Sequence, residues 1–345
     1  MLRSSRGPAR ALSHEDPRKA DRARRSPTMH NAVSFDQVMA AAAAVSTTFE
    51  NFPADPVSAT NAGTISASAR AEVVDRYERH GFAVIQLDPH RVTAETLLAL
   101  AESFDLGAPF VPPLYATNGK PVATVARISA AAADVATARH PSFERTVGLA
   151  LHCDGTLQEI GFVKVSVLLC EAPAAQGGET ILFNASAAYA QLAAVDAPAA
   201  AALATPGALI RQANINGCRD VNAGPAFTVQ EHQLVCGYSV TATDRWSVPV
   251  SVAEADLYRG VGFLLHASLP GSPHFAELAL EAGQAIVFDN TRISHGRTSY
   301  CDNPSRPRCL YRSLHLRHPS VRQLHTITVA ARVAVEGSHP APATP

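Results

Sequence analysis

The chain has 345 residues, a 47% share of hydrophobic residues and a formal net charge of −1. This size and apolar content suffice for one large domain with a substantial core. The near-zero charge gives no reason to expect nucleic acid or a membrane as partner, and no apolar run approaches the roughly 18 residues of a membrane span. The six cysteines form no CxxC pair, which favours reduced thiols in a soluble, cytoplasmic protein.

Both ends of the chain are predicted to be disordered tails. Residues 1–30 are rich in arginine and poor in large apolar residues, and they lack the apolar core of a secretory signal. Met29 is an alternative to Met1 as the translation start. Residues 336–345 have the composition of a frayed end. Residues 31–335 show no repeat and no obvious linker, so a single domain is expected there.

The first predicted elements are two helices separated by a short strand. Residues 68–81 place apolar side chains at helical spacing and end at Gly81, a residue typical of helix C-termini. Residues 82–87 follow as the strand. A second amphipathic helix is expected over residues 93–107, with Thr93 as its N-terminal cap.

From residue 150 onward the pattern changes to strands. Short, β-branched or alternating segments bounded by turn-forming residues occur at 162–169, 179–184, 233–240, 284–289 and 308–317. The core strands are therefore expected within residues 150–184 and 280–318. The stretch 185–275 between them is expected to hold a lid or substrate loops. Helices followed by many short strands favour an α+β fold with a β-sandwich or barrel core.

The tripeptide His152-Cys153-Asp154 carries two metal-capable side chains one residue apart. With 14 histidines and 30 acidic residues, chance supplies about one such spacing, and His14-Glu15-Asp16 is another instance. An ordinary surface or core histidine is therefore a serious alternative for His152. On a strand, alternate residues point to the same side, so His152 and Asp154 could act together while Cys153 points away.

A third candidate ligand is His295, which follows the predicted strand 284–289 and a short turn. A histidine from a distant strand could complete one face of ligands with His152 and Asp154. Two histidines and one carboxylate on one face are the ligand set of non-haem Fe(II) oxygenases, which keep adjacent positions open. The same three residues could also hold zinc with a bound water in a hydrolase.

Two arginines lie on the last predicted strand. The even positions of residues 308–317 hold Arg308 and Arg312 together with leucines, so both guanidinium groups share the more apolar, inward face. Burying a guanidinium group is costly unless it meets a carboxylate, and its planar donors suit two-point capture of one. An anionic substrate or cosubstrate is therefore expected, with an internal ion pair as the alternative.

Four stretches together resemble the taurine dioxygenase and clavaminate synthase-like group of Fe(II)- and 2-oxoglutarate-dependent oxygenases. They are LHCDG (151–155), APAAQGGETILFN (172–184), LEAGQAIVFDNTRISHGRTSY (280–300) and RPRCLYRSLHLR (306–317). The resemblance covers roughly residues 70–320, and the segment around His295 is its most specific part. It implies a distorted double-stranded β-helix, a cupin-like jelly roll with flanking helices.

The resemblance implies that His152, Asp154 and His295 bind Fe(II) and form the catalytic centre. It also implies oxidative decarboxylation of 2-oxoglutarate to succinate and CO2 with O2, coupled to hydroxylation of an unactivated C–H bond. Desaturation, epoxidation and cyclisation on the same site are alternatives. The zinc-dependent hydrolase and a ligand-binding jelly roll without turnover are the more distant ones.

The resemblance further assigns residues to the cosubstrate. Thr180 matches the position whose hydroxyl binds 2-oxoglutarate, and Arg308 matches the arginine that binds its distal carboxylate. Arg312, four residues further along the same face, matches a second arginine that often meets the substrate. The two arginine roles can be exchanged between relatives, so their division is left open here.

The substrate is expected to be a small molecule. Arg312 indicates an acid, either an amino acid or a carboxylate-bearing natural-product intermediate. Arg211 and Tyr238, in the stretch before the second group of core strands, are further candidates for substrate contact. Tyr115 and Asn118 belong to a loop that resembles one near the metal. A homo-oligomer is compatible with all of these expectations.

Overall fold

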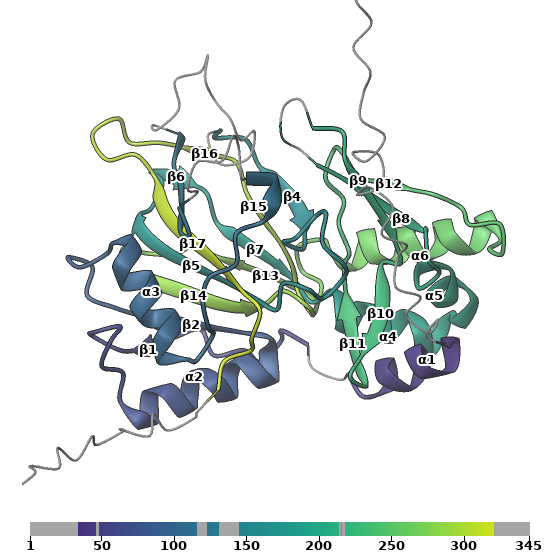
Figure 1. Cartoon of the computed structure of the whole chain (residues 1–345), viewed down its shortest axis with the longest axis horizontal. Coiled ribbons are helices and arrows are strands. Elements are labelled where there is room, and N and C mark those ends of the chain that lie inside the picture. Colours follow the sequence, from purple (N-terminus) through teal and green to yellow (C-terminus); the bar gives the residue numbers. More distant parts are fainter. Residues whose placement is uncertain are drawn as a thin grey trace, which may run out of the picture.

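The fold of the described chain combines helices with two principal β-sheets (Figure 1). The structure, a computed structural model, describes residues 34–45, 48–115, 123–130, 145–213, 215 and 218–320. The predicted tails 1–30 and 336–345 lie outside these residues. The helices are α1 (Phe35–Ala43), α2 (Ala67–His80), α3 (Ala94–Ser103), α4 (Ala185–Val195), α5 (Ala197–Leu203) and α6 (Glu254–Ala267), with a 3-10 turn at Pro113–Tyr115.

The larger sheet has six strands. In spatial order they are β1 (Val57–Ser58), β2 (Phe82–Gln86), β14 (Gln284–Asp289), β5 (Val165–Ala172), β17 (Cys309–His315) and β3 (Ala126–Ile128). Only the β1–β2 pair is parallel. Strands far apart in sequence therefore lie side by side, and the last described strand, β17, pairs with β5 inside the sheet.

The second principal sheet has four strands, in the order β13 (Phe275–Leu278), β7 (Thr180–Phe183), β15 (Ser294–Arg297) and β4 (Leu149–His152). It faces the six-stranded sheet, and no hydrogen-bonded strand pair joins the two sheets within the described ranges. Smaller sheets contain β12 (Arg245–Trp246), β8 (Leu209–Gln212) and β9 (Val221–Gly224), the hairpin β10 (Phe227–Gln230) and β11 (Gln233–Cys236), and the pair β16 (Tyr300–Cys301) and β6 (Gln176–Gly177).

Strand β5 shows why the central strands read as unbroken apolar runs. Val165 and Val167 point to one side and pack in the core formed with α2 and α3. Leu168 points to the other side and packs with Leu182 of the four-stranded sheet. A strand covered on both faces requires apolar residues at nearly every position. The six-stranded sheet is thus the middle layer between helices and the second sheet.

The predicted helix boundaries are confirmed at three of four ends. Helix α2 ends at Gly81, whose φ of 80° is left-handed, and an added Cβ there would lie 2.8 Å from the Ile293 side chain. Helix α3 begins after Thr93, whose hydroxyl accepts from the Thr96 backbone N–H. Its C-terminus comes earlier than predicted, because Asp105 and Gly107 both have positive φ and turn the chain.

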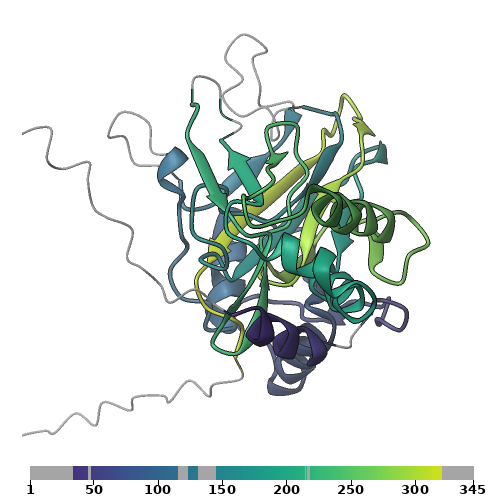
Figure 2. The same cartoon turned by 90° about the vertical axis from the view of Figure 1, so that its right-hand side faces the viewer.

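The stretch 185–275, expected to hold a lid or substrate loops, contains helices α4, α5 and α6 together with strands β8 to β12. Helices α4, α5 and α6 pack on one another and on the β10–β11 hairpin. Figures 1 and 2 show these helices gathered at the end of the molecule away from α2 and α3. Alanine side chains are small, so these helices can pack closely against one another. The stretch therefore forms a buried core although its sequence lacks the alternating pattern of strands.

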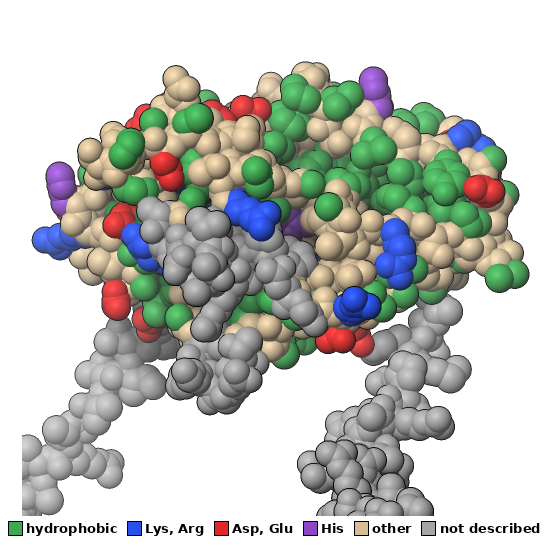
Figure 3. All heavy atoms as spheres, turned by 90° about the horizontal axis from the view of Figure 1, so that it is seen from above, with side chains coloured by type: hydrophobic (Ala, Val, Ile, Leu, Met, Phe, Trp, Pro, Cys, Tyr) green, Lys and Arg blue, Asp and Glu red, His purple; other side chains and the backbone are tan. Residues whose placement is uncertain are grey.

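The face of the molecule drawn in Figure 3 carries few grouped basic side chains. Lys and Arg side chains stand apart from one another over the face in Figure 3, without an extended basic area among the residues drawn in colour. Within the described ranges, no helix is both long enough and apolar enough to span a lipid bilayer. All six cysteines are free thiols.

His315 gives the fold a testable dependence on pH. It is fully buried at the end of β17, where its Nδ1 donates to the Gly107 carbonyl and its Nε2 accepts from the Ser313 hydroxyl. Burial lowers the pKa of His315 to about 4. The unfolded chain, with a pKa near 6.5, takes up a proton first, so this stability is present above about pH 6.5 and is lost as the pH falls toward 4.

The variant His315→Gln is therefore expected to flatten the decline in unfolding free energy between pH 6.5 and 4.5, by about 2–3 kcal/mol. Urea unfolding at the two pH values measures this difference. His266→Gln, at an exposed position of α6, is the matched control and should keep the wild-type decline. An identical decline in His315→Gln and the wild type would contradict the expectation.

Candidate metal centre

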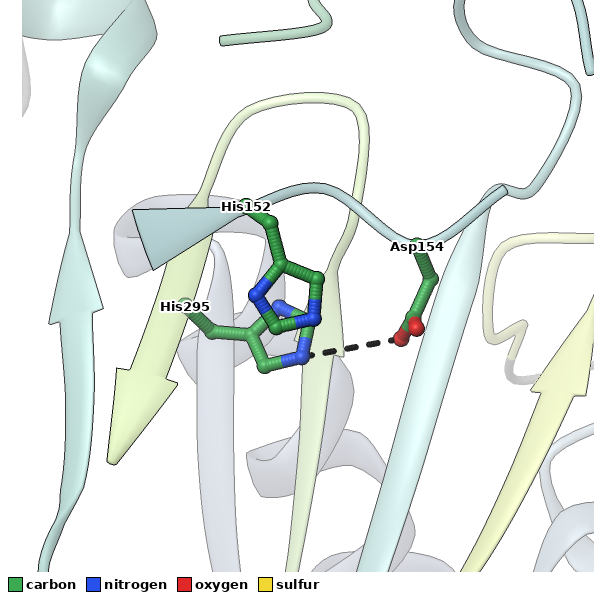
Figure 4. Close-up of side chains that lie close together, drawn as sticks. All are labelled: His152, Asp154 and His295. Carbon is green, nitrogen blue, oxygen red and sulfur yellow. Dashed lines mark ion pairs between the residues drawn. The ribbon is translucent and has the colours of Figure 1, made fainter. Parts of the chain in front are cut away.

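Three predicted ligands come together at the edge of the four-stranded sheet. His152 ends β4, Asp154 follows in the next loop, and His295 lies on β15 directly opposite His152. One possible ligand atom from each residue lies within 4.8 Å of the others. Figure 4 shows both rings and the carboxylate facing a common space. This arrangement can hold a single metal ion.

Both histidines present a nitrogen suited to a metal. The Nδ1 of His152 lies 3.0 Å from the Ala150 carbonyl and donates to it, which leaves Nε2 with its lone pair. The Nε2 of His295 lies 3.6 Å from an oxygen of Asp154, longer than a hydrogen bond. Burial, reinforced by nearby His152, lowers the pKa of His295 to about 3. His295 is thus neutral at neutral pH, the state that metals require.

Asp154 is held as an anion in a fixed orientation. One carboxylate oxygen accepts from the Arg312 guanidinium at 2.8 Å, and the other accepts from the Ser166 hydroxyl at 2.7 Å. Burial alone would raise the pKa of Asp154, but Arg312 and then the two histidines hold it well below its usual range. The charged form is the one that binds a metal, so this surrounding favours a ligand role.

The backbone of Asp154 is fixed by Asn290, a residue that the sequence did not single out. Its side-chain oxygen accepts from the Asp154 N–H at 2.7 Å, and its amide nitrogen donates to the carbonyls of Asp154 and Val163. Asn290 stands in the same turn that leads to His295 and so ties the two ligand segments together. Its position in the DNTRISH stretch, five residues before His295, is the sequence feature that could have marked Asn290 as part of the site. No comparable signal marked Ser166.

A cavity of about 40 Å³ adjoins two of the three ligands, His152 and His295. Its walls come from both principal sheets: Ile128, Leu149, His152, Leu168, Thr180, His295, Gly296, Arg297, Arg308, Leu310 and Arg312. Thr180 and both predicted arginines are therefore brought to the metal site. The alternation predicted for β17 is confirmed, since Arg308, Leu310 and Arg312 share the inward face.

Two guanidinium groups of the cavity wall make no ion pair with a described carboxylate. Arg308 is 4% exposed; one of its terminal nitrogens donates to the Gly178 carbonyl at 3.1 Å, and the other has no described partner. Arg297 donates to backbone carbonyls and, like Arg308, lies over the Tyr300 ring. Burial lowers the pKa of both arginines, and two such charges favour an anionic ligand.

Arg312 differs from Arg308, because its charge is met inside the protein by Asp154. The internal ion pair considered for the inward arginines thus exists for one of them. Tyr115 also hydrogen-bonds to Arg312, which brings the loop before residue 116 to the site. Asn118 lies outside the described residues.

Two expected substrate contacts lie elsewhere. Arg211 is buried on β8 behind the ligand loop and donates to the Gly155 carbonyl at 3.0 Å and, more weakly, to that of Cys153. Tyr238 is fully buried and packs edge-on against Phe183 in the helical core. Neither residue lines the metal cavity. Arg211 supports the loop that carries Asp154 instead of facing a ligand.

Cys153, between two ligands, points away from the metal cavity as the strand alternation predicts. Its sulfur lies 3.4 Å from the Ser294 hydroxyl and 3.9 Å from the Cys236 sulfur, inside the helical core. The side chain therefore packs behind the site and leaves the ligand face to His152 and Asp154.

Comparison with known proteins now decides the family. The model of the taurine catabolism dioxygenase TauD, TfdA family matches residues 44–314, well over half of the chain. The chain belongs to this family. TauD/TfdA members are oxygenases that use Fe(II), 2-oxoglutarate and O2, and this enzyme has the His-Asp-His cluster that such chemistry needs. The two distant alternatives, that the chain is a zinc-dependent hydrolase or a ligand-binding jelly roll without turnover, do not agree with this family.

Two curated relatives within this family share most of their length with the chain. A uridine-5'-phosphate dioxygenase from an Amycolatopsis species is 37% identical over 257 residues, which is 73% of this chain and 90% of the relative. A second protein of that name, from a Streptomyces species, is 32% identical over 253 residues, or 72% and 90%. Identities at this level over nearly a whole relative agree with the family assignment.

A solved taurine dioxygenase from Burkholderia xenovorans has a similar fold. It superimposes with a TM-score of 0.50 at 20% identity, covering 77% of this chain and 92% of that one. At this identity the likeness concerns the fold alone. It supports the TauD-type arrangement of mixed helices and sheets.

Proposed function

We propose that this TauD/TfdA oxygenase acts on a uridine nucleotide, with uridine 5'-phosphate as the first candidate. The observation that carries this proposal is the pair of relatives named uridine-5'-phosphate dioxygenase, each aligned over 90% of its length. The substrate expected from Arg312 was an acid of the amino-acid or carboxylate class. Because Arg312 is paired with Asp154, this arginine no longer argues for either kind of anion; guanidinium groups bind phosphate and carboxylate alike by paired hydrogen bonds.

The site residues fit the cofactor and cosubstrate of the family. In this proposal His152, Asp154 and His295 hold Fe(II), while Arg308 and the Thr180 hydroxyl bind the distal carboxylate of 2-oxoglutarate. The supporting observations are a neutral buried His295, an ionised Asp154 and the unpartnered donor of Arg308. When bound, Fe(II) and 2-oxoglutarate would supply the chemistry that activates O2, in which one oxygen atom enters succinate as CO2 is lost and the other is available to oxidise the substrate.

The protein's own part is orientation and protection of the site. Ser166 and Arg312 fix the carboxylate of Asp154, and Asn290 fixes its backbone. The apolar walls formed by Ile128, Leu168 and Leu310 limit the access of water.

We also propose that residues 31–335 form one domain, whose two principal sheets are the halves of a distorted double-stranded β-helix. The supporting observation is that the two sheets face each other around the ligands and share a buried core. Hydroxylation is the proposed outcome on the substrate. Desaturation or oxidative cyclisation would remove two hydrogens and so give a product of different mass, whereas epoxidation adds one oxygen, as hydroxylation does, and needs the product structure to tell them apart.

A coupled assay tests the substrate proposal. The purified chain with Fe(II), 2-oxoglutarate and O2 is offered uridine 5'-phosphate, uridine, L-asparagine or L-arginine, and succinate is measured together with substrate loss by mass spectrometry. The proposal predicts that uridine 5'-phosphate stimulates succinate formation and is itself consumed in equal amount. Stimulation by an amino acid, with the nucleotide inert, would replace the nucleotide by the carboxylate class first expected.

Arg308→Met is expected to raise the KM for 2-oxoglutarate by about 10- to 100-fold, because charge-assisted hydrogen bonds contribute about 1.5–3 kcal/mol. Initial rates of succinate formation across 2-oxoglutarate concentrations measure the effect. Arg306→Met is the control, since this exposed arginine donates only to the Glu171 carbonyl among the described residues. Equal KM values in both variants would remove Arg308 from the cosubstrate site.

A further inference from the structure

We propose that a second cavity, beside the metal cavity, receives the pyrimidine base of the substrate, and that Phe110 is the ring on which the base stacks. The inference rests on the proposed function and adds the part of the chain that would select a nucleotide. It concerns a site to which no residue has so far been assigned.

The size of the metal cavity makes a second space necessary. At about 40 Å³ it is far smaller than small-molecule pockets, which typically measure about 300–1,000 Å³. The second cavity measures about 340 Å³. Arg312 lines both cavities, so the larger cavity adjoins the metal cavity at this residue.

Two other described cavities fit this role less well. The cavity of about 550 Å³ beside α1 and α2 shares no wall residue with the metal cavity. The cavity of about 230 Å³ shares Arg308 and Leu310 but has no aromatic residue in its described wall. Among these three cavities, the one of about 340 Å³ is therefore the cavity that both adjoins the metal cavity and has aromatic side chains in its wall.

The walls of this cavity suit a flat base with polar edges. They are formed by Phe110, Val111, Pro112, Tyr115, Ala123, Thr124, Val125, Ala126, Arg127, Arg312, Ser313 and Leu314. Most of the wall residues are apolar or aromatic, and Thr124 and Ser313 are polar residues among them, the Ser313 hydroxyl already donating to His315. Recognition of a base needs both features, because its faces are apolar and its edges carry donors and acceptors.

Phe110 is held in place as a stacking surface. Its backbone N–H donates to the Leu314 carbonyl at 2.7 Å, which joins the loop to β17. Its ring lies 5.1 Å from the Phe162 ring at an angle of 70°, an edge contact that uses at most one face of Phe110. A ring braced in this way can accept a base without losing further freedom, and such stacking contributes about 1–3 kcal/mol.

The test compares binding of a ligand with the base to binding of one without it. Uridine 5'-phosphate and ribose 5-phosphate are titrated calorimetrically into the anaerobic full chain containing Fe(II) and 2-oxoglutarate. Phe110→Leu is expected to raise the Kd of uridine 5'-phosphate by about 5- to 100-fold, the equivalent of one stacked base, and to leave that of ribose 5-phosphate unchanged. Phe110→Tyr keeps the ring and should bind the nucleotide as the wild type does.

In a second variant, Ala126→Leu, the larger side chain on β3 extends into the cavity. It should weaken the binding of uridine 5'-phosphate and leave the binding of ribose 5-phosphate unchanged. Equal weakening of both ligands by Phe110→Leu, or none, would overturn the base pocket while leaving the nucleotide as substrate. Equal affinity of the wild type for both ligands would do the same. A wild-type chain that binds neither ligand would overturn the proposed function itself, and the base pocket with it.

Discussion

Replacing His295 by alanine is expected to abolish Fe(II) binding and, with it, the formation of succinate. His295 supplies one of three donors within 4.8 Å of one another, and its ring is neutral and buried. Loss of a residue that only supports a ligand costs about 10- to 100-fold in metal affinity or activity, so loss of the ligand itself should exceed the upper end of that range. Equilibrium dialysis against Fe(II) without oxygen measures affinity, and succinate release measures turnover.

The control for this variant is His266→Ala, which removes an exposed histidine from α6 and should leave both measurements unchanged. Thermal unfolding of the metal-free proteins shows whether His295→Ala still folds. A folded His295→Ala protein that binds one equivalent of Fe(II) with wild-type affinity would exclude His295 as a ligand.

Replacing Arg312 by methionine is expected to lower the free energy of unfolding by about 3–5 kcal/mol, because the charge of Asp154 would remain buried without its partner. The two groups are 2.8 Å apart, and their side chains are only 7% and 6% exposed. Urea unfolding at neutral pH measures the loss. The exposed Arg317, whose nitrogen lies 3.6 Å from Asp105, gives the matched control Arg317→Met, with an expected cost of about 0–1 kcal/mol.

A double variant separates the ion pair from the packing of Arg312. Arg312→Met combined with Asp154→Asn removes both charges, and replacing a whole buried pair is often nearly neutral. The double variant should therefore recover much of the stability that Arg312→Met loses. Additive losses from the two single changes would show that the two side chains do not depend on each other.

The sequence predicted those parts of the fold that depend on local patterns. Gly81 and Thr93 marked helix ends through backbone geometry and capping, and both were confirmed. The alternation along β17 placed Arg308 and Arg312 on the inward face, where the structure has them. These signals work because one residue and its near neighbours determine them.

Interactions between distant segments could not be derived in this way. Arg312 meets Asp154 across 158 positions of the chain, and no local pattern distinguishes this partner from a substrate. Arg211 and Tyr238 were both predicted to contact the substrate, but Arg211 donates to backbone carbonyls of a loop and Tyr238 fills a hydrophobic core. Their surroundings depend on how the 185–275 stretch folds, which its alanine-rich composition did not reveal.

The nucleotide proposal also changes what the inward arginines mean. They predicted an anion without distinguishing carboxylate from phosphate, since both accept paired hydrogen bonds from guanidinium. The relatives point to phosphate, and the cavity bounded by Phe110 provides space that an amino acid would not need. The choice between these substrates therefore depends on the base and its stacking partner more than on the anion.

The most direct test of the account is an anaerobic titration of the purified protein with Fe(II) and then 2-oxoglutarate, followed by visible absorption. An Fe(II) ion chelated by a 2-oxo acid has a weak charge-transfer band. In the wild type, this band is expected to saturate at one equivalent of iron. It should be absent in His295→Ala, and in Arg308→Met it should appear only at higher concentrations of 2-oxoglutarate. A folded wild-type protein that shows no band, or a band retained in His295→Ala, would contradict the assignment of His152, Asp154 and His295 as the iron site.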